Sequence, residues 1–184
     1  MEEEPEVKDS PNAHPLSLSN GAIEVCNVSF SYNPNREILK HVSFHIPAGK
    51  TLAIVGESGA GKSTLARLLF RFYDVTEGAI FVDGQDIRDV TQESLRRAIG
   101  IVPQDTVLFN NTLYYNIAYG NTQATKKEVE AAAKHAHLDN FIKKLPEGYE
   151  TVVGERGLKL SGGEKQRVAI ARTLLKKPSI FLFD

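Results

Sequence analysis

Gly56-Glu-Ser-Gly-Ala-Gly-Lys-Ser63 is the stretch of sequence that decides the fold. It matches the pattern G-x-x-x-x-G-K-[ST] at every fixed position, and such glycines let backbone N–H groups turn toward an anion at a helix N-terminus. The apolar run at residues 51–55 predicts a strand buried on both faces, and leucines at helical spacing follow from Leu65. Strand, loop and helix together predict a phosphate cradle, in which Lys62 reaches the β- and γ-phosphates and the Ser63 hydroxyl ligates Mg²⁺.

Strands and helices alternate on both sides of this loop. Alternation and short apolar runs predict strands at residues 23–30, 42–46, 79–82, 99–102 and 179–183, and helical spacing predicts helices at 65–72 and 91–98. Such an order is typical of an α/β protein with a mostly parallel sheet and helices on both faces. Ligands of such proteins bind at the carboxyl ends of strands, where the candidate residues of this chain fall.

Two capping boxes mark helix starts in the second half. Thr125 with Glu128 opens an alanine-rich helix inside a helical subdomain at about residues 105–160, and Ser161 with Glu164 opens another helix. Gly162 and Gly163 leave the first backbone amides of that helix bare, which indicates either a flexible entry or a second phosphate site. One chain can hardly use both cradles on the same γ-phosphate. Two chains facing each other, each offering one site to the other's nucleotide, would use both.

An acidic residue, Asp184, follows the apolar strand at residues 180–183. Alone it is more often a turn or cap residue. Together with the glycine-rich loop it predicts a carboxylate that holds Mg²⁺, usually through water.

The composition excludes several classes of protein. The 184 residues are 41% hydrophobic and 24% charged, unlike a collagen, a coiled coil or a disordered chain. The net charge of −1 gives no reason to expect nucleic acid as a partner. The single cysteine, Cys26, cannot form an internal disulfide, and neither a secretory signal nor an apolar run of membrane-spanning length is present. Residues 1–20, with three prolines and an acidic cluster, predict a solvated linker.

The segment Leu160-Ser-Gly-Gly-Glu-Lys-Gln166 carries a family resemblance. It is similar to the signature of the ATP-binding cassette (ABC) transporters, and it lies in the family's order between the glycine-rich loop and the acidic strand. Residues 21–184 resemble the nucleotide-binding domain of that family. The resemblance implies a P-loop NTPase (RecA-like) core with N-terminal antiparallel β strands and an inserted helical subdomain, the C-terminal part of the core being absent.

The resemblance also implies the residues of the site. Tyr32 would stack on adenine, although packing locally in its loop is the alternative. Gln104 resembles the family's glutamine that touches Mg²⁺ or the attacking water. Lys62, Gln104 and Asp184 would be catalytic, and Ser63, Gln104 and Asp184 would face the metal. ATP would contact Tyr32, Gly56, Glu57, Ser58, Gly59, Ala60, Gly61, Lys62, Ser63, Thr64, Gln104, Ser161, Gly162, Gly163 and Gln166.

Further segments resemble exporters within the family. They are Asn111-Thr-Leu-Tyr-Tyr-Asn-Ile117 and Val153-Gly-Glu-Arg-Gly157, and residues 4–9 are similar to a linker that follows a membrane domain. The combination of Arg67-Leu-Leu-Phe-Arg-Phe-Tyr73 with Arg156-Gly-Leu-Lys-Leu-Ser-Gly-Gly163 is similar to half-transporters of the mitochondrial iron–sulfur and heavy-metal group and their bacterial relatives. This implies a homodimer with ATP between two such domains, a transmembrane domain in the same parent chain, and a place on the cytoplasmic or matrix face of a membrane.

The family places a water-orienting glutamate directly after the residue that matches Asp184. We therefore expect the parent protein to hydrolyse ATP and the 184-residue chain alone to be nearly inactive. Two alternatives stay open at this stage: a soluble ABC ATPase without a membrane partner, and a nucleotide-binding fragment that does not hydrolyse.

Overall fold

The structure, a computed structural model, describes residues 7–57 and 59–184. They form two units, one ending at Ile99 and the other Gly100–Asp184. Ser58, a predicted phosphate contact, lies outside the described residues.

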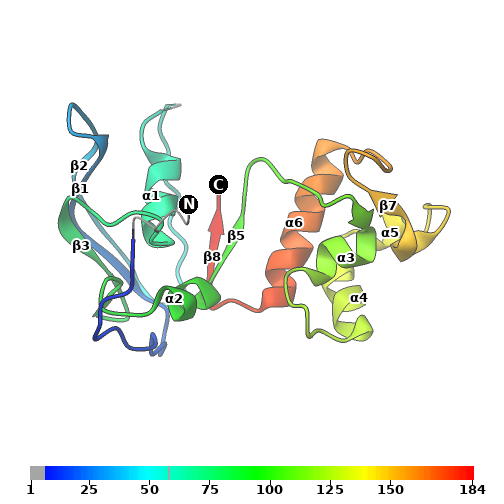
Figure 1. Ribbon diagram of the computed structural model, residues 1–184, viewed down its shortest axis with the longest axis horizontal. Coiled ribbons are helices and arrows are strands. Elements are labelled where there is room, and N and C mark those ends of the chain that lie inside the picture. The colour runs from blue at the N-terminus through cyan, green and yellow to red at the C-terminus, as the bar shows by residue number, and fades with distance from the viewer. Residues whose placement is uncertain (1–6, 58) are drawn as a thin grey trace, which may run out of the picture. The chain divides into compact units, whose positions relative to one another are not determined.

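An antiparallel four-stranded sheet organises the first unit. Its order is β2-β1-β3-β4, formed by β1 (Ile23–Asn33), β2 (Arg36–Ile46), β3 (Glu77–Val82) and β4 (Gln85–Asp86) (Figure 1). β1 pairs with both β2 and β3, so Ile23 lies opposite Ile46 on one side and Val82 on the other. Both pairings are antiparallel, which confirms the antiparallel strands expected at the N-terminus, and Val25 and Ile80, which lie opposite each other, are buried.

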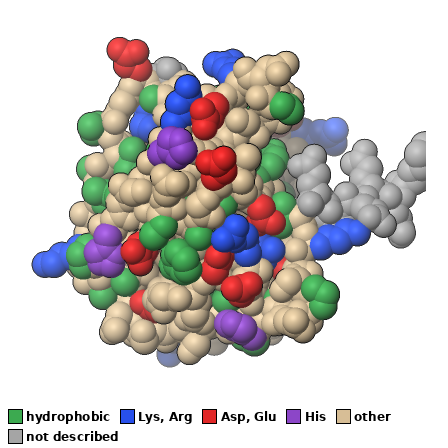
Figure 2. All heavy atoms as spheres, turned by 90° about the vertical axis from the view of Figure 1, so that its left-hand side faces the viewer, with side chains coloured by type: hydrophobic (Ala, Val, Ile, Leu, Met, Phe, Trp, Pro, Cys, Tyr) green, Lys and Arg blue, Asp and Glu red, His purple; other side chains and the backbone are tan. Residues whose placement is uncertain are grey.

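Two helices belong to the same unit. α1 (Lys62–Leu69) buries Leu65, Leu68 and Leu69, as its leucine spacing predicts. α2 (Gln92–Ala98) buries Leu95 and Ala98. On the face of the molecule in Figure 2, acidic and basic side chains are interspersed.

Residues 51–55, predicted to be a buried strand, are irregular in the structure, and that prediction is wrong. Leu52, Ile54 and Val55 are 42%, 47% and 89% exposed. A strand buried on both faces forms only where neighbouring strands satisfy its backbone N–H and C=O groups. No strand formed by the described residues pairs with 51–55.

The N-terminal segment (residues 7–22) is mostly exposed, but it is not the free solvated tail that its composition predicts. Asp83 accepts backbone hydrogen bonds of 2.8–2.9 Å from Ser19, Asn20, Gly21 and Ala22. Desolvation alone would raise the pKa of Asp83, but these four N–H donors outweigh it and hold the pKa well below its usual range. The segment is therefore tied to the end of β3 by a carboxylate 61 to 64 positions away in sequence.

A buried arginine fastens the start of the same segment. Arg71, 3% exposed, donates to the carbonyl oxygens of Lys8 and Val90 and to the Asp74 carboxylate. Because each of its three nitrogens has an acceptor, the guanidinium can lie in the interior.

The second unit is mainly helical. It contains α3 (Leu113–Ala118), α4 (Lys126–His135), α5 (Asp139–Ile142), the 3₁₀ turn η1 (Gly148–Glu150) and α6 (Gly162–Lys176). Apolar residues of α3, α4 and α6, among them Ile117, Val129 and Val168, form one core. The capping boxes predicted at Thr125 and Ser161 are confirmed at the starts of α4 and α6.

Two short strand pairs complete this unit. β5 (Ile99–Val102) pairs with β8 (Ile180–Phe183), and both run in the same direction in Figure 1. β6 (Asn111–Thr112) pairs antiparallel with β7 (Val152–Val153). Among the described residues, no helix is long and apolar enough to cross a membrane.

Candidate functional site

In the P-loop (residues 56–63), the lysine side chain binds backbone carbonyl oxygens of the same loop. Lys62 Nζ donates to the carbonyl oxygens of Gly56 and Glu57, at 2.7 Å each, and Ala60 N donates to the Glu57 carbonyl at 3.2 Å. The residues Gly56, Glu57, Gly59 and Ala60 are exposed. An entering anion would find the ammonium group at the loop, where the carbonyl oxygens that bind it are neutral and can be replaced by phosphate oxygens.

Gly61 is required by both its backbone and its neighbours. It caps α1 at the N-terminus with φ of 91°, and an added Cβ would lie 2.7 Å from Leu39 Cδ2. No acidic side chain occupies the first turn of α1, so its positive end favours an anion. Ser63 and Thr64 follow on that first turn.

Tyr32 lies at the end of β1, in an aromatic cluster. Its ring makes edge contacts with Phe30 and Tyr73 at centroid distances of 4.9 and 5.1 Å. Its hydroxyl donates to Thr64 Oγ1 at 3.3 Å and accepts from Arg67 Nη1 at 3.1 Å. These bonds tie the ring to α1, directly after the P-loop.

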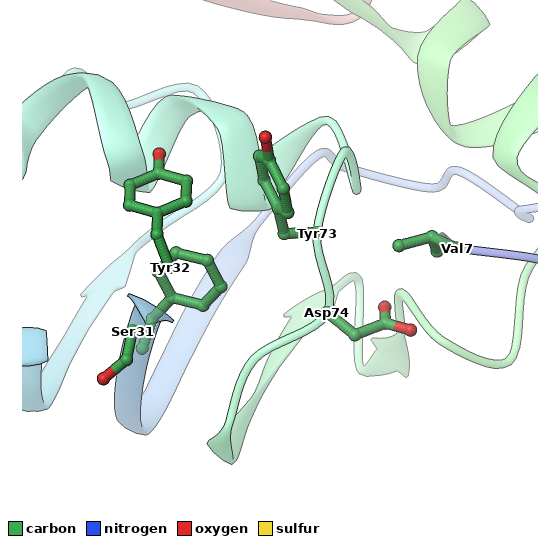
Figure 3. A pocket seen from close by; sticks show the side chains of 6 residues that line it. Val7, Ser31, Tyr32, Tyr73 and Asp74 are labelled. Atoms are coloured by element: carbon green, nitrogen blue, oxygen red, sulfur yellow. The ribbon is translucent and has the colours of Figure 1, made fainter. Parts of the chain in front are cut away.

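A cavity of about 450 Å³ opens beside this ring, lined by Val7, Phe30, Ser31, Tyr32, Tyr73 and Asp74. Figure 3 shows the two tyrosines side by side with their hydroxyls on the same side. Tyr32 is 39% exposed, so part of it remains available for a planar ligand. Its stacking on adenine stays a prediction.

Gln104 and Asp184 follow two paired strands of the second unit. Gln104 comes two residues after β5, and Asp184 comes directly after β8. The Asp184 N–H donates to the Val102 carbonyl at 3.1 Å, so both residues stand near the carboxyl ends of these strands. Both are exposed. Lys62 and Ser63 belong to the first unit.

The signature segment (residues 160–166) begins α6. Ser161 Oγ accepts from the Glu164 N–H at 3.3 Å, and the Glu164 carboxylate accepts from Ser161 N at 2.7 Å. An added Cβ at Gly162 would meet nothing within 4 Å, and one at Gly163 would meet only Arg167 Nη2 at 4.0 Å. Gly162, Gly163 and Gln166 are exposed. Among the described residues, none lies close enough to require glycine at these two positions.

The sequence alone does not predict a cluster of hydrogen bonds that joins Arg172 to Asn116 and to the segment after Gln104. From the sequence, Arg172 is assigned no role, and Asn116 is included only in an exporter-like segment. In the structure Asn116 is fully buried and Arg172 donates to it. The position of this arginine between apolar residues of a helix could have indicated such a cluster, since a charged side chain on a buried face needs hydrogen-bond acceptors.

These features are typical of a nucleotide-binding cassette. They are a P-loop, a second exposed helix start that contains two glycines, and polar residues at the ends of paired strands. The model of the family described as ABC transporter matches residues 39–184, and the chain belongs to this family.

Its relatives include exporters of bacteria and mitochondria. The chain is 64% identical to an ATM1-type heavy metal exporter of Novosphingobium aromaticivorans, over 97% of this chain and 29% of that protein. It is 60% identical to the mitochondrial iron–sulfur clusters transporter atm1 of Aspergillus fumigatus, over 97% of this chain and 25% of that protein. A solved bacterial Atm1-family ABC exporter with ATP bound superposes with a TM-score of 0.94 at 64% identity, over 97% of this chain and 31% of that one. The chain thus spans less than a third of each relative.

Proposed function

We propose that this chain binds and hydrolyses ATP as the nucleotide-binding domain of a membrane exporter. One observation carries the proposal: the chain has both a P-loop and a capped signature helix whose glycines the fold itself does not require. Other P-loop enzymes, such as GTPases and small kinases, need no such helix.

The P-loop residues fit a triphosphate. Backbone amides of Gly56, Glu57, Ser58, Gly59, Ala60, Gly61 and Thr64 would surround the phosphates, as the glycine-rich pattern predicts. Lys62 would exchange the two loop carbonyls for β- and γ-phosphate oxygens. The Tyr32 ring would stack on adenine.

The donor set also fits Mg²⁺. Ser63 offers a hydroxyl, Gln104 an amide oxygen and Asp184 a carboxylate, which are the oxygen ligands that this ion accepts. When bound, Mg²⁺ neutralises charge on the phosphate oxygens. Gln104 would orient the attacking water as well.

We further propose that the active unit contains two copies of the chain. Ser161, Gly162, Gly163 and Gln166 of one copy would contact the γ-phosphate held by the P-loop of the other. The exposed helix start of α6 supports this arrangement, since the first N–H groups of a helix attract an anion.

A complementation experiment tests this arrangement. Lys62→Ala and Gly163→Ala each disable both sites of a homodimer. Mixed dimers would keep one intact site, formed by the P-loop of the Gly163→Ala copy and the signature of the Lys62→Ala copy. Co-expression should therefore restore about a quarter of the wild-type hydrolysis, because random pairing makes half of the dimers mixed. If each chain used its own signature, the mixture would stay inactive.

Hydrolysis itself is tested with single lysine variants. In the purified transporter that carries this domain, Lys62→Ala should abolish ATP hydrolysis. Lys50→Ala removes an exposed lysine upstream of the P-loop and should leave hydrolysis unchanged. Equal rates in the two variants would refute the role of the P-loop.

The membrane part of the proposal rests on the relatives, which are named as exporters or transporters. We propose that the domain works with a transmembrane domain of the same parent chain, on the cytoplasmic or matrix face. Reconstitution in vesicles, with ATP supplied on one side, tests this. Hydrolysis without any lipid-embedded partner in the natural assembly would favour a soluble ABC ATPase instead.

A further inference from the structure

Gln104 lies on a short stretch that is anchored at both ends to the same helix turn. Before it, the Ile101 carbonyl oxygen is 2.8 Å from Thr173 Oγ1. After it, the Val107 carbonyl accepts from Arg172 Nη1 at 2.9 Å. Ile101 and Val107 each stand three positions from Gln104, and Arg172 and Thr173 are consecutive residues of α6. The stretch between the anchors therefore has little freedom to shift along α6.

The downstream anchor extends into a buried hydrogen-bond network. Arg172 Nη2 donates to Asn116 Oδ1 at 2.6 Å, and Arg172 Nε donates to the Asn116 carbonyl oxygen. Asn116 in turn accepts from the Phe109 N–H at 2.9 Å and donates to the Phe109 carbonyl at 3.0 Å. Arg172 Cζ lies 5.5 Å from the centroid of the Phe109 ring. One guanidinium thus holds the chain at Val107, Phe109 and Asn116 together.

The acceptors of this arginine are unusual for a half-buried cation. All three of its hydrogen-bonded oxygens are neutral, and no carboxylate of the described residues forms an ion pair with it. Burial also lowers the pKa of Arg172. Neutral acceptors compensate a buried charge less well than a carboxylate does, so stability alone is a weak reason for this arginine. The planar fork that reaches three oxygens at once is what lysine cannot reproduce.

The upstream anchor is a close contact as well as a hydrogen bond. An added Cβ at Gly100 would lie 2.6 Å from Thr173 Cγ2, so β5 approaches α6 without room for a side chain. Thr173 Oγ1 can also bond the Ala169 carbonyl in its own helix, at 2.9 Å. Its position on α6 is therefore fixed while it contacts β5.

We infer that Arg172 and Thr173 are positioning residues, which fix Gln104 relative to the helix that begins at the signature glycines. This inference rests on the proposed role of Gln104 in ATP hydrolysis. Nucleotide affinity would depend on the P-loop and Tyr32, which belong to the other unit of the chain. Loss of an anchor should thus lower kcat and leave the Kd for ATP unchanged.

A double-mutant cycle tests the inference in the full transporter. Arg172→Lys keeps the charge and removes the fork, and we expect a fall in kcat of about ten- to a hundredfold, the range that follows from about 1 Å of misplacement. Thr173→Val removes the hydroxyl at nearly constant shape and should act in the same direction, whereas Thr173→Ser keeps the bond and should not. Arg97→Lys, at an exposed arginine of α2, is the matched control. In a Gln104→Ala background, Arg172→Lys should have almost no further effect on kcat.

The possible outcomes distinguish failure of the positioning role of Arg172 and Thr173 from failure of the proposed role of Gln104. A full additional loss from Arg172→Lys in the Gln104→Ala background would overturn the inference, because the arginine would then act independently of Gln104. A parallel rise in the Kd for ATP would overturn it too. If Gln104→Ala leaves hydrolysis unchanged, the proposed role of Gln104 fails instead. Should Arg172→Lys not fold, the Thr173→Val and Thr173→Ser pair, crossed with Gln104→Ala, decides the question alone.

Discussion

Alanine at the two signature glycines should raise stability and abolish activity at the same time. Gly162 and Gly163 lie in the exposed first turn of α6, without positive φ, and an added Cβ touches nothing closer than 4.0 Å. Replacing glycine by alanine at such a position restricts the unfolded chain and stabilises the folded one by about 0.5 kcal/mol. For a chain of this size we expect an unfolding temperature about 1–2 °C higher for each substitution.

Hydrolysis should move in the opposite direction. The new methyl group would stand where the γ-phosphate of a facing nucleotide approaches the N–H groups of the helix start. Because the methyl group would keep the phosphate out of hydrogen-bond reach of these donors, we expect a loss like that of one such donor, about 10²–10³ in kcat. Thermal unfolding of the purified protein and steady-state ATP hydrolysis measure the two effects on the same preparations.

A third glycine supplies the control for stability. An added Cβ at Gly157 would lie 2.5 Å from the Val152 carbonyl oxygen, so Gly157→Ala should lower the unfolding temperature. The reasoning is refuted if Gly162→Ala or Gly163→Ala hydrolyses ATP at the wild-type rate. It is also refuted if these variants unfold as easily as Gly157→Ala, since their inactivity would then reflect the fold.

Three further substitutions test contacts of the fold. Asp83→Asn should lower the free energy of unfolding by about 1–2 kcal/mol at pH 7, because the carboxylate accepts four backbone N–H groups. Folding lowers the pKa of Asp83, so its contribution to the free energy of unfolding is complete above the unfolded pKa of about 4 and is lost as the pH falls. In urea titrations, the difference in unfolding free energy between the wild type and Asp83→Asn should therefore be smaller at pH 3 than at pH 7. Gly61→Ala should destabilise α1 and weaken nucleotide binding, because both φ of 91° and Leu39 oppose a side chain, as calorimetry and ATP titration would show. Ser161→Ala should cost about 1 kcal/mol through loss of the cap, whereas Ser161→Thr should keep most of it in thermal unfolding.

Sequence reasoning succeeded where the signal was local. A capping box involves residues three positions apart, so Thr125 with Glu128 and Ser161 with Glu164 could be identified before any tertiary contact was known. The P-loop pattern likewise contains its own chemistry within eight positions. The alternation in β3 belongs to the same class, because it can be read from the order of the side chains, whereas in β1 the alternation is broken at Val28, Ser29 and Phe30, which are all buried.

It failed where the outcome depended on distant partners. The apolar run at 51–55 has the composition of a buried strand, but a strand also needs neighbours, and composition does not supply them. The N-terminal segment has the composition of a linker, yet a single carboxylate some 60 positions away orders its end. Local propensity could not predict either result.

The candidate site also contains both local motifs and contacts between residues that are distant in sequence, and the two kinds of residue should differ in their kinetic effects. Most of the residues that would touch nucleotide lie in two contiguous motifs, which is why the sequence alone suggested them, whereas Tyr32 and Gln104 were implied by the family resemblance. The contacts behind Gln104 join Arg172 to Val107 across 65 positions and Thr173 to Ile101 across 72, so no window of sequence contains them. A motif residue acts on the nucleotide itself, and its loss should change affinity as well as rate. An anchoring residue acts only through the placement of another side chain, and its loss should change rate alone. Kinetic measurements can therefore distinguish variants of motif residues from variants of anchoring residues, even where the two kinds of variant unfold at the same temperature.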